Sequence, residues 1–218
     1  VQVARTVMAQ ISASVASSQY AGQSVDIRHL GKYLRRSYNK FKKAVLDEVG
    51  DSLPAETVER LVQARLKSEL QSGVQTIQYQ INTLMTTNGQ SPFVTIFLNL
   101  QEDDEYLKEN AMIVEEILRQ RLQGIKNDKG VYVTPAFPKL VYVLDEHNCL
   151  KGGKYDYITK LAVKCSAKRL YPDYISAKKI REHYEGNVFS PMGCRSFLAP
   201  WKDENGNYKI TGRIKDMI

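Results

Sequence analysis

The sequence contains few cysteines and no long hydrophobic run. No apolar stretch approaches the ~18–20 residues that cross a bilayer, and no charged start followed by an apolar segment indicates a secretory signal. The three cysteines, Cys149, Cys165 and Cys194, are widely spaced and form no CxxC pair, which argues against a disulfide framework and against a zinc site. These absences predict a cytoplasmic protein with no membrane partner and no bound metal.

The charge balance is basic, in an otherwise ordinary globular composition. Hydrophobic residues make up 43% of the 218 positions and charged residues 25%, and the net charge is +7. Such a charge permits a polyanionic partner. Nucleic acid is a weak candidate for that partner, because the sequence has neither a helix-turn-helix pattern nor an aromatic platform for stacked bases. Val1 rather than Met stands first, which suggests a fragment or a processed chain.

Hydrophobic periodicity predicts three helices before the first strand. An alanine-rich helix is expected over 3–18, a basic helix from about His29 to Val49, and a long helix from Pro54 to about Met85. Most basic residues of the second helix are expected to be solvated, although one or two are candidates for binding nucleotide phosphates. Small residues on the first helix would let another helix approach closely, and they are Ala9, Ser12, Ala13, Ala16 and Ser17.

The chain then alternates between strands and helices. The β-branched and aromatic runs at 93–98 and 139–144 have few polar atoms, which is typical of strands buried on both faces. Further helices are expected at 105–123, 155–170 and 176–184, with a charged loop at 126–130. The alternation favours an α/β architecture with mainly parallel strands.

Residues 188–213 are predicted to form a loop followed by a hairpin. Pro191 and Gly193 interrupt any periodicity, and the Asn205-Gly206 pair suits a tight hairpin turn. Composition alone favours a buried, structural Cys194, the commonest fate of an intracellular cysteine. Its neighbours, Gly193 and Arg195, favour instead a thiol that the loop presents for chemistry.

This loop carries a resemblance to a known family. The run SPMGCRSFL at 190–198, followed by WKD at 201–203 and Gly212-Arg213, resembles the finger loop of the anaerobic, class III ribonucleotide reductases. Those proteins are glycyl-radical enzymes that reduce ribonucleoside triphosphates. The similarity covers almost the whole chain, with further matching runs at 16–20, 79–84, 88–95, 135–143 and 162–178.

The resemblance implies a fold and a place within it. Residues 1–88 are expected to form a helical dimer and effector region, and residues 89–218 part of a ten-stranded α/β barrel threaded by the finger loop, 188–213. The four-cysteine zinc segment, the radical glycine and the ATP-cone domain of the family have no match here, and residues 214–218 depart from its pattern. The chain is therefore expected to be an internal fragment of the catalytic domain, with no cofactor of its own.

The resemblance also implies an activity, which is the reduction of ribonucleoside triphosphates to deoxyribonucleoside triphosphates for DNA synthesis. The resemblance implies that Cys194 carries the transient thiyl radical. Arg195 and Ser196 are candidates for ordering the loop or for contacting polar substrate groups, and a salt bridge that fixes the loop is an equally open role for Arg195. Gln10 and Lys40 match residues associated with the deoxynucleotide effector site, although Lys40 also fits a merely solvated lysine.

The partners implied by the resemblance are those of the full-length family. They are a glycyl radical and a structural zinc ion, ATP or deoxynucleotide effectors, a radical-SAM activating enzyme, and a second copy in a homodimer. The fragment alone is expected to be inactive, and the reductant, formate or a small redox protein, stays open. The alternative function is a non-catalytic remnant that binds nucleotides or dimerises.

Overall fold

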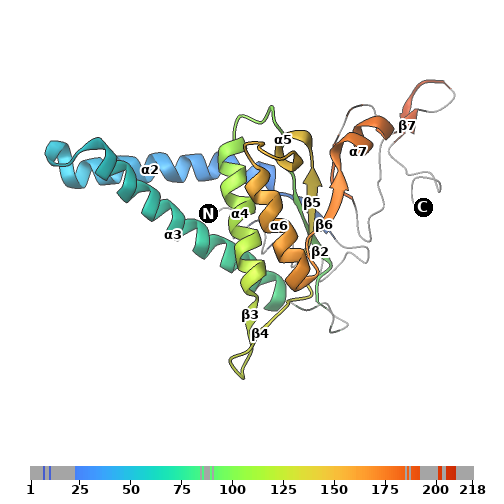
Figure 1. The fold of residues 1–218 in the computed structure, drawn as a ribbon, viewed down its shortest axis with the longest axis horizontal. Helices are drawn as coiled ribbons and strands as arrows, with labels where there is room; N and C mark the ends of the chain where they lie inside the picture. Colours follow the sequence, from blue (N-terminus) through green and yellow to red (C-terminus); the bar gives the residue numbers. More distant parts are fainter. Residues whose placement is uncertain are drawn as a thin grey trace.

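The computed structural model describes residues 23–83, 91–184 and 188–191, together with 7, 10, 85, 89, 186, 201–202 and 205–209. Its centre is a parallel β-sheet that carries helices on one face, and a long pair of helices projects away from it (Figure 1). Within the described residues, no helix is both long enough and apolar enough to cross a bilayer.

The projecting pair of helices confirms two of the three predicted N-terminal helices. Its elements are the 3-10 turn η1 (Ile27–Leu30), α2 (Gly31–Val49), the 3-10 turn η2 (Gly50–Ser52) and α3 (Ala55–Thr83). At its outer end Val45, Val58 and Val62 form a hydrophobic cluster of their own. Of the predicted helix 3–18, Val7 and Gln10 are helical and the other residues lie outside the described part.

The sheet confirms the predicted α/β class. Its strands follow the order β1-β2-β5-β6, and every neighbouring pair is parallel. Both predicted strands are present, whereas the two edge strands were not predicted, because each has only four residues and little hydrophobic pattern. The strands are β1 (Gln23–Asp26), β2 (Val94–Leu98), β5 (Lys139–Leu144) and β6 (Asp173–Ser176).

One face of the sheet packs against α4 (Leu107–Gln123) and α6 (Asp156–Arg169), which lie side by side over it in Figure 1. Side chains such as Ile96 and Tyr142 from the strands enter one large core with Val114 of α4 and Ile158 of α6. Burial of each such aliphatic side chain contributes roughly 1.5–3 kcal/mol. The C-terminal half of α3 joins this core through Ile77 and Ile81, so one end of the projecting pair packs against the helices and the sheet.

Shorter elements complete the described structure. The charged segment 126–130 connects the two strands of an antiparallel hairpin, β3–β4, that was expected only as a loop. The hairpin predicted around Asn205-Gly206 is confirmed, since Trp201 pairs with Lys209 and Gly206 adopts a φ of +78°. These elements are β3 (Ile125–Lys126), β4 (Tyr132–Val133), α5 (Glu146–Cys149), α7 (Ala177–His183), β7 (Trp201–Lys202) and β8 (Tyr208–Lys209).

Two buried arginines fix the carboxyl end of α4. The guanidinium of Arg121 is 1% exposed and donates to the backbone carbonyls of Pro135, at 2.9 Å, and Pro138. Burial lowers the pKa of Arg121 to about 10, so it stays protonated at neutral pH. Arg169 donates to the carbonyl of Leu122 at 3.0 Å and to that of Gln123, which satisfies backbone acceptors that a helix end leaves unpaired.

A glycine sets how closely the projecting pair approaches α4. Gly31 begins α2 with an ordinary helical φ of −54°, so its backbone would accept any residue. A Cβ at this position would lie 2.6 Å from Asn110 Oδ1 and 2.7 Å from Tyr106 Cβ. The helices can therefore cross this closely only because position 31 has no side chain.

We expect Gly31→Ala to destabilise the chain. Alanine gains about 1 kcal/mol in helix propensity over glycine, but relief of the overlap with Tyr106 requires a shift of the first turn of α4, at a cost of about 1–3 kcal/mol. Thermal unfolding followed by circular dichroism measures the difference. The control is Lys32→Ala at the exposed neighbouring position, which should change stability by less than about 0.5 kcal/mol. A Gly31→Ala variant that is more stable than the parent would contradict the close crossing.

Candidate functional site

The two faces of the sheet differ in what they contact. Successive side chains of a strand point to opposite faces, and Val94, Ile96 and Leu98 enter the core beneath α4 and α6. The residues between them therefore point away from those helices, and the parallel register extends this second face to the neighbouring strands. We call it the loop face, and it comprises Ser24, Asp26, Thr95, Phe97, Asn99, Val141, Val143 and Ile175.

The first residues of the predicted cysteine loop, 188–191, pack on the loop face. Phe97, Val141 and Val143 form a small buried cluster there with Ala177 of α7, and Val188 packs against that cluster. The segment thus returns from α7, beside β6, across the middle strands of the sheet. It covers apolar side chains that the helices on the other face cannot reach.

Polar contacts hold the end of this segment against the opposite edge of the sheet. The Ser24 hydroxyl of β1 donates a hydrogen bond to the carbonyl of Pro191. The hydroxyl of Ser190 donates to the same carbonyl at 3.2 Å, and the rings of Tyr184 and Phe189 meet edge to face with centroids 5.0 Å apart. The first residues of the loop therefore cross the loop face from β6 to β1.

The three residues predicted for catalysis, Cys194, Arg195 and Ser196, lie outside the described residues. Covalent connection limits how far Cys194 is from the sheet. It follows Pro191 by three residues, and three residues of fully extended chain span at most about 11 Å. The described structure thus fixes the root of the predicted loop, at the loop face beside β1.

Ion pairs at the carboxyl ends of the strands fix the elements that lead to this segment. Asp145, after β5, accepts the backbone N–H of Glu146 at 2.9 Å and pairs with Arg181 of α7, whose Nη1 lies 3.1 Å from Oδ1. Burial alone would raise the pKa of Asp145, but the Arg181 and Glu146 hydrogen bonds outweigh it and lower the pKa below the ordinary value. A second pair joins Arg28 to Asp26 at the end of β1. Sequence reasoning predicted neither pair.

The amide nitrogen of a buried asparagine on the loop face has no hydrogen-bond partner in the described part of the chain. Asn99 is 3% exposed, and its Nδ2 makes no hydrogen bond. It follows β2 between Leu98 and Leu100, both of which face the helix-side core, so its own side chain is on the other face. The one sequence signal for it is a polar residue directly after the apolar run FVTIFL.

The comparison with protein families supplies the identification. A model of the family described as anaerobic ribonucleoside-triphosphate reductase matches residues 1–215. The chain belongs to this family. Membership agrees with the resemblance expected from the loop sequence.

Individual anaerobic ribonucleoside-triphosphate reductases resemble the chain along nearly all of its length. The protein of that name from Enterobacteria phage T4 is 39% identical over 217 residues, which is 97% of this chain and 34% of the phage protein. The Escherichia coli protein is 37% identical over 98% of the chain, and the Salmonella typhimurium protein 36% over 98%. The chain spans 28% of the length of each of these two bacterial relatives.

The residues predicted for effector binding lie on exposed helical positions of the chain. Gln10 is an exposed helical residue and Lys40 is exposed on α2, and no hydrogen bond joins them in the described structure. Lys40 belongs to a stripe spaced by three or four residues, so its members share one helix face. Among the described residues no carboxylate forms a salt bridge with this stripe of Lys32, Arg36, Lys40 and Lys43.

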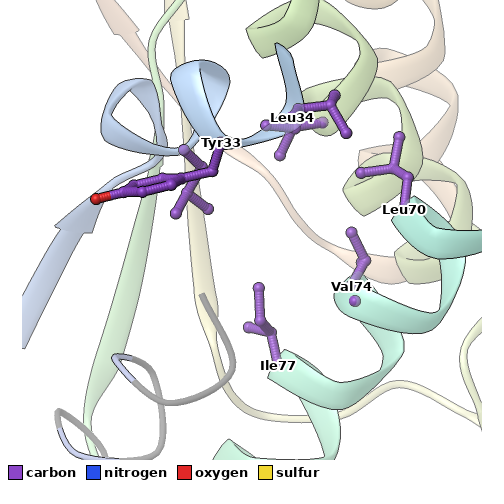
Figure 2. A pocket seen from close by; sticks show the side chains of 8 residues that line it. Tyr33, Leu34, Leu70, Val74 and Ile77 are labelled. Carbon is purple, nitrogen blue, oxygen red and sulfur yellow. The ribbon is translucent and has the colours of Figure 1, made fainter. Parts of the chain in front are cut away.

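A separate hollow lies where α2, α3 and α4 meet. It is lined by aliphatic side chains such as Leu34, Leu70, Val74 and Ile77 (Figure 2). The ring of Tyr33 borders it with its hydroxyl directed away from the other labelled side chains. The lining offers no charged group for a phosphate, so this hollow is not a site for the triphosphate moiety of a nucleotide.

The two described cysteines of the chain differ in exposure. Cys165 is fully buried in α6, and burial raises the pKa of its thiol to about 11. Cys149 is exposed at the end of α5. In the described part of the chain, no three His, Cys, Asp or Glu side chains are grouped to hold a metal ion.

We expect an alkylating reagent to discriminate between the two thiols. Because the thiolate is the reactive species, iodoacetamide at mildly alkaline pH should modify Cys149 rapidly in the native chain. Cys165 should react only as the chain unfolds. Mass spectrometry of the two cysteine-containing peptides at successive times measures both rates. Denatured chain serves as the control, in which the rates should converge, and comparable rates in the native chain would contradict the burial of Cys165.

Proposed function

We propose that the chain is the part of an anaerobic ribonucleoside-triphosphate reductase that carries the radical cysteine, Cys194. The observation that supports this most directly is the attachment of Pro191 to Ser24 on the loop face, in a chain that belongs to the family. The root of the cysteine-bearing loop thus lies on the sheet face opposite the helices. The full-length protein would reduce ribonucleoside triphosphates to deoxyribonucleoside triphosphates for DNA synthesis.

The proposed setting of the loop is the interior of an α/β barrel. Four parallel strands with the long helices α4 and α6 on one face are compatible with one arc of such a barrel, because a barrel carries its helices outside. We propose that the remaining strands belong to parts of the protein beyond these residues and complete ten strands. A closed barrel would bury the loop face around the finger loop, residues 188–213, and exclude water and oxygen from the radical.

The proposed chemistry begins on sulfur. When the radical segment of the full-length family is present, its glycyl radical would take the hydrogen atom of the Cys194 S–H bond and leave a thiyl radical on sulfur. The thiyl radical would then take the 3′-hydrogen of the ribose, so that the C3′–H bond breaks, the S–H bond of Cys194 forms again and the unpaired electron is left on C3′. Replacement of the 2′-hydroxyl by hydrogen releases water and takes two electrons from formate or a small redox protein, together with two protons. Return of the hydrogen atom from Cys194 to C3′ restores the thiyl radical. Arg195 and Ser196 are proposed to order the loop or contact the substrate.

The proposed effector site uses the basic stripe of α2. Four exposed like charges on one helix face repel one another, and a polyphosphate would relieve that repulsion. We propose that Lys40, with Gln10, binds the phosphates of a deoxynucleotide or ATP at the interface of a homodimer. Activation would require a radical-SAM partner enzyme.

The same stripe supports the alternative function, a non-catalytic module that binds nucleotides or dimerises. Such a module would keep the basic face of α2 without needing a reactive thiol. The coding sequence downstream separates the two proposals, because only the reductase requires a radical-glycine segment. Activity of a Cys194 variant separates them as well.

Cys194→Ser in the full-length protein should abolish ribonucleotide reduction. Serine keeps the size of the side chain, but its O–H bond is too strong to exchange a hydrogen atom with a carbon radical, whereas the thiol S–H bond is weak enough. The variant should fold normally, because the change of one atom leaves little cavity. Product formation is measured by chromatography, and the glycyl radical by electron paramagnetic resonance.

The matched control for that variant is Cys149→Ser, which alters an exposed cysteine and should retain full activity. Retention of reduction by Cys194→Ser would show that Cys194 is a structural thiol. Loss of the glycyl radical together with activity would indicate a role in activation and would likewise count against the assigned chemistry.

Lys40→Ala in the full-length protein should weaken effector binding and spare basal turnover. Loss of one charge-assisted phosphate contact costs about 1.5–3 kcal/mol, roughly a ten- to hundredfold decrease in affinity. Equilibrium dialysis with a labelled deoxynucleotide measures the affinity. Lys67→Ala, at an exposed lysine of α3, removes the same charge elsewhere and should leave the affinity unchanged. Equal affinities of the Lys40 variant and the parent would assign Lys40 to the solvated face of α2.

A further inference from the structure

We propose that Ser24 is a positioning residue for the radical cysteine, because its hydroxyl fixes the root of the finger loop to the sheet through the carbonyl of Pro191. This inference rests on the proposed function and assigns a role to a residue that the resemblance does not mark. The contact joins residues that are far apart in the sequence, in the first strand and in the segment that enters the loop.

The donor is held by a rigid strand. All four residues of β1 pair in parallel with β2, and Ser24 pairs with Thr95. Val25 packs against the helix-side core, so alternation directs Ser24 onto the loop face. At the end of the strand, Asp26 caps η1 and accepts the backbone N–H of Arg28 at 2.9 Å. The hydroxyl is therefore fixed in position by its own strand and not by the loop that it contacts.

The acceptor is well placed to control the loop. Pro191 has no backbone N–H, so its carbonyl is the one main-chain group with which this residue can be hydrogen-bonded to the sheet. The second donor to that carbonyl, Ser190, is its neighbour in the chain and moves with it. Among the described hydrogen bonds, only that of Ser24 links the carbonyl of Pro191 to a strand. Pro191 precedes Cys194 by three residues.

The step that depends on this link is hydrogen-atom transfer from C3′ to sulfur. Misplacement of a reacting group by about 1 Å can cost a hundredfold in rate. Without the Ser24 hydroxyl, the loop root keeps the apolar contact of Val188 but loses its attachment at β1. The sulfur would then sample positions from which transfer is slow, while the binding surface for the substrate stays unchanged.

The test compares four variants of the full-length reductase after activation. Ser24→Ala removes the hydroxyl, and Ser24→Thr and Ser24→Val form a pair of nearly equal shape that differ in the hydroxyl. Ser166→Ala is the control, because Ser166 also donates to a proline carbonyl, that of Pro172 at 2.8 Å, away from the loop. The measurements are glycyl-radical content, melting temperature, KM, kcat, and the isotope effect with 3′-deuterated substrate.

We expect kcat to fall about ten- to a hundredfold in Ser24→Ala and Ser24→Val, with normal radical content and KM. Their isotope effect should exceed that of the parent, because hydrogen transfer becomes rate-limiting. Ser24→Thr should restore kcat and the isotope effect to near the parent values, because its hydroxyl replaces that of serine. Ser166→Ala should behave as the parent in every kinetic measurement.

Two results would overturn the assignment. Parent-like kcat and isotope effect in both Ser24→Ala and Ser24→Val would mean that the loop needs no anchor at β1. Equal losses in Ser24→Thr and Ser24→Val, with a lowered melting temperature, would reduce Ser24 to a structural role. Neither result would contradict the proposed function, which is contradicted separately if Cys194→Ser remains active.

Discussion

The parallel sheet must be covered on both faces, and the rest of the structure follows from this requirement. Parallel strands bring apolar side chains to both sides, as β2 does with Ile96 on one face and Phe97 on the other. The helices α4 and α6 cover the first face. On the loop face the chain itself returns, with Val188 over the middle strands and Pro191 at β1. The same requirement that stabilises the sheet thus guides the segment toward Cys194.

The sequence permitted the prediction of elements whose signal is local. The runs at 93–98 and 139–144 form strands because almost every side chain is apolar, and the helices predicted from His29 onward occur near their expected bounds. The short strands β1 and β6 lack such a signal, since they are specified by pairing with β2 and β5. Edge strands of four residues depend on a neighbour that a linear pattern does not reveal.

The same distinction applies to the candidate site. Cys194, Arg195 and Ser196 were assigned through a contiguous stretch of loop sequence, which a family resemblance can carry. Ser24 and Asn99 were missed, because each matters through its place on the loop face and not through its neighbours in the sequence. Arg121 was missed for a related reason, since its carbonyl partners Pro135 and Pro138 come from a loop that only the fold brings to it.

The position of the projecting helices within the chain has a consequence for folding. Both helices of the pair lie in the sequence between β1 and β2, although these strands are adjacent in the sheet and Gln23 pairs with Val94. Contacts between residues so distant in the chain form late, because closing the long loop between them costs chain entropy before the strand pairing can offset that cost. Until β1 pairs with β2, one edge of the apolar strand β2 has no partner strand, and unpaired edges of this kind can pair with another chain. Pairing of α2 with α3 brings the two ends of this segment together, and so shortens the loop that the pairing of β1 with β2 has to close.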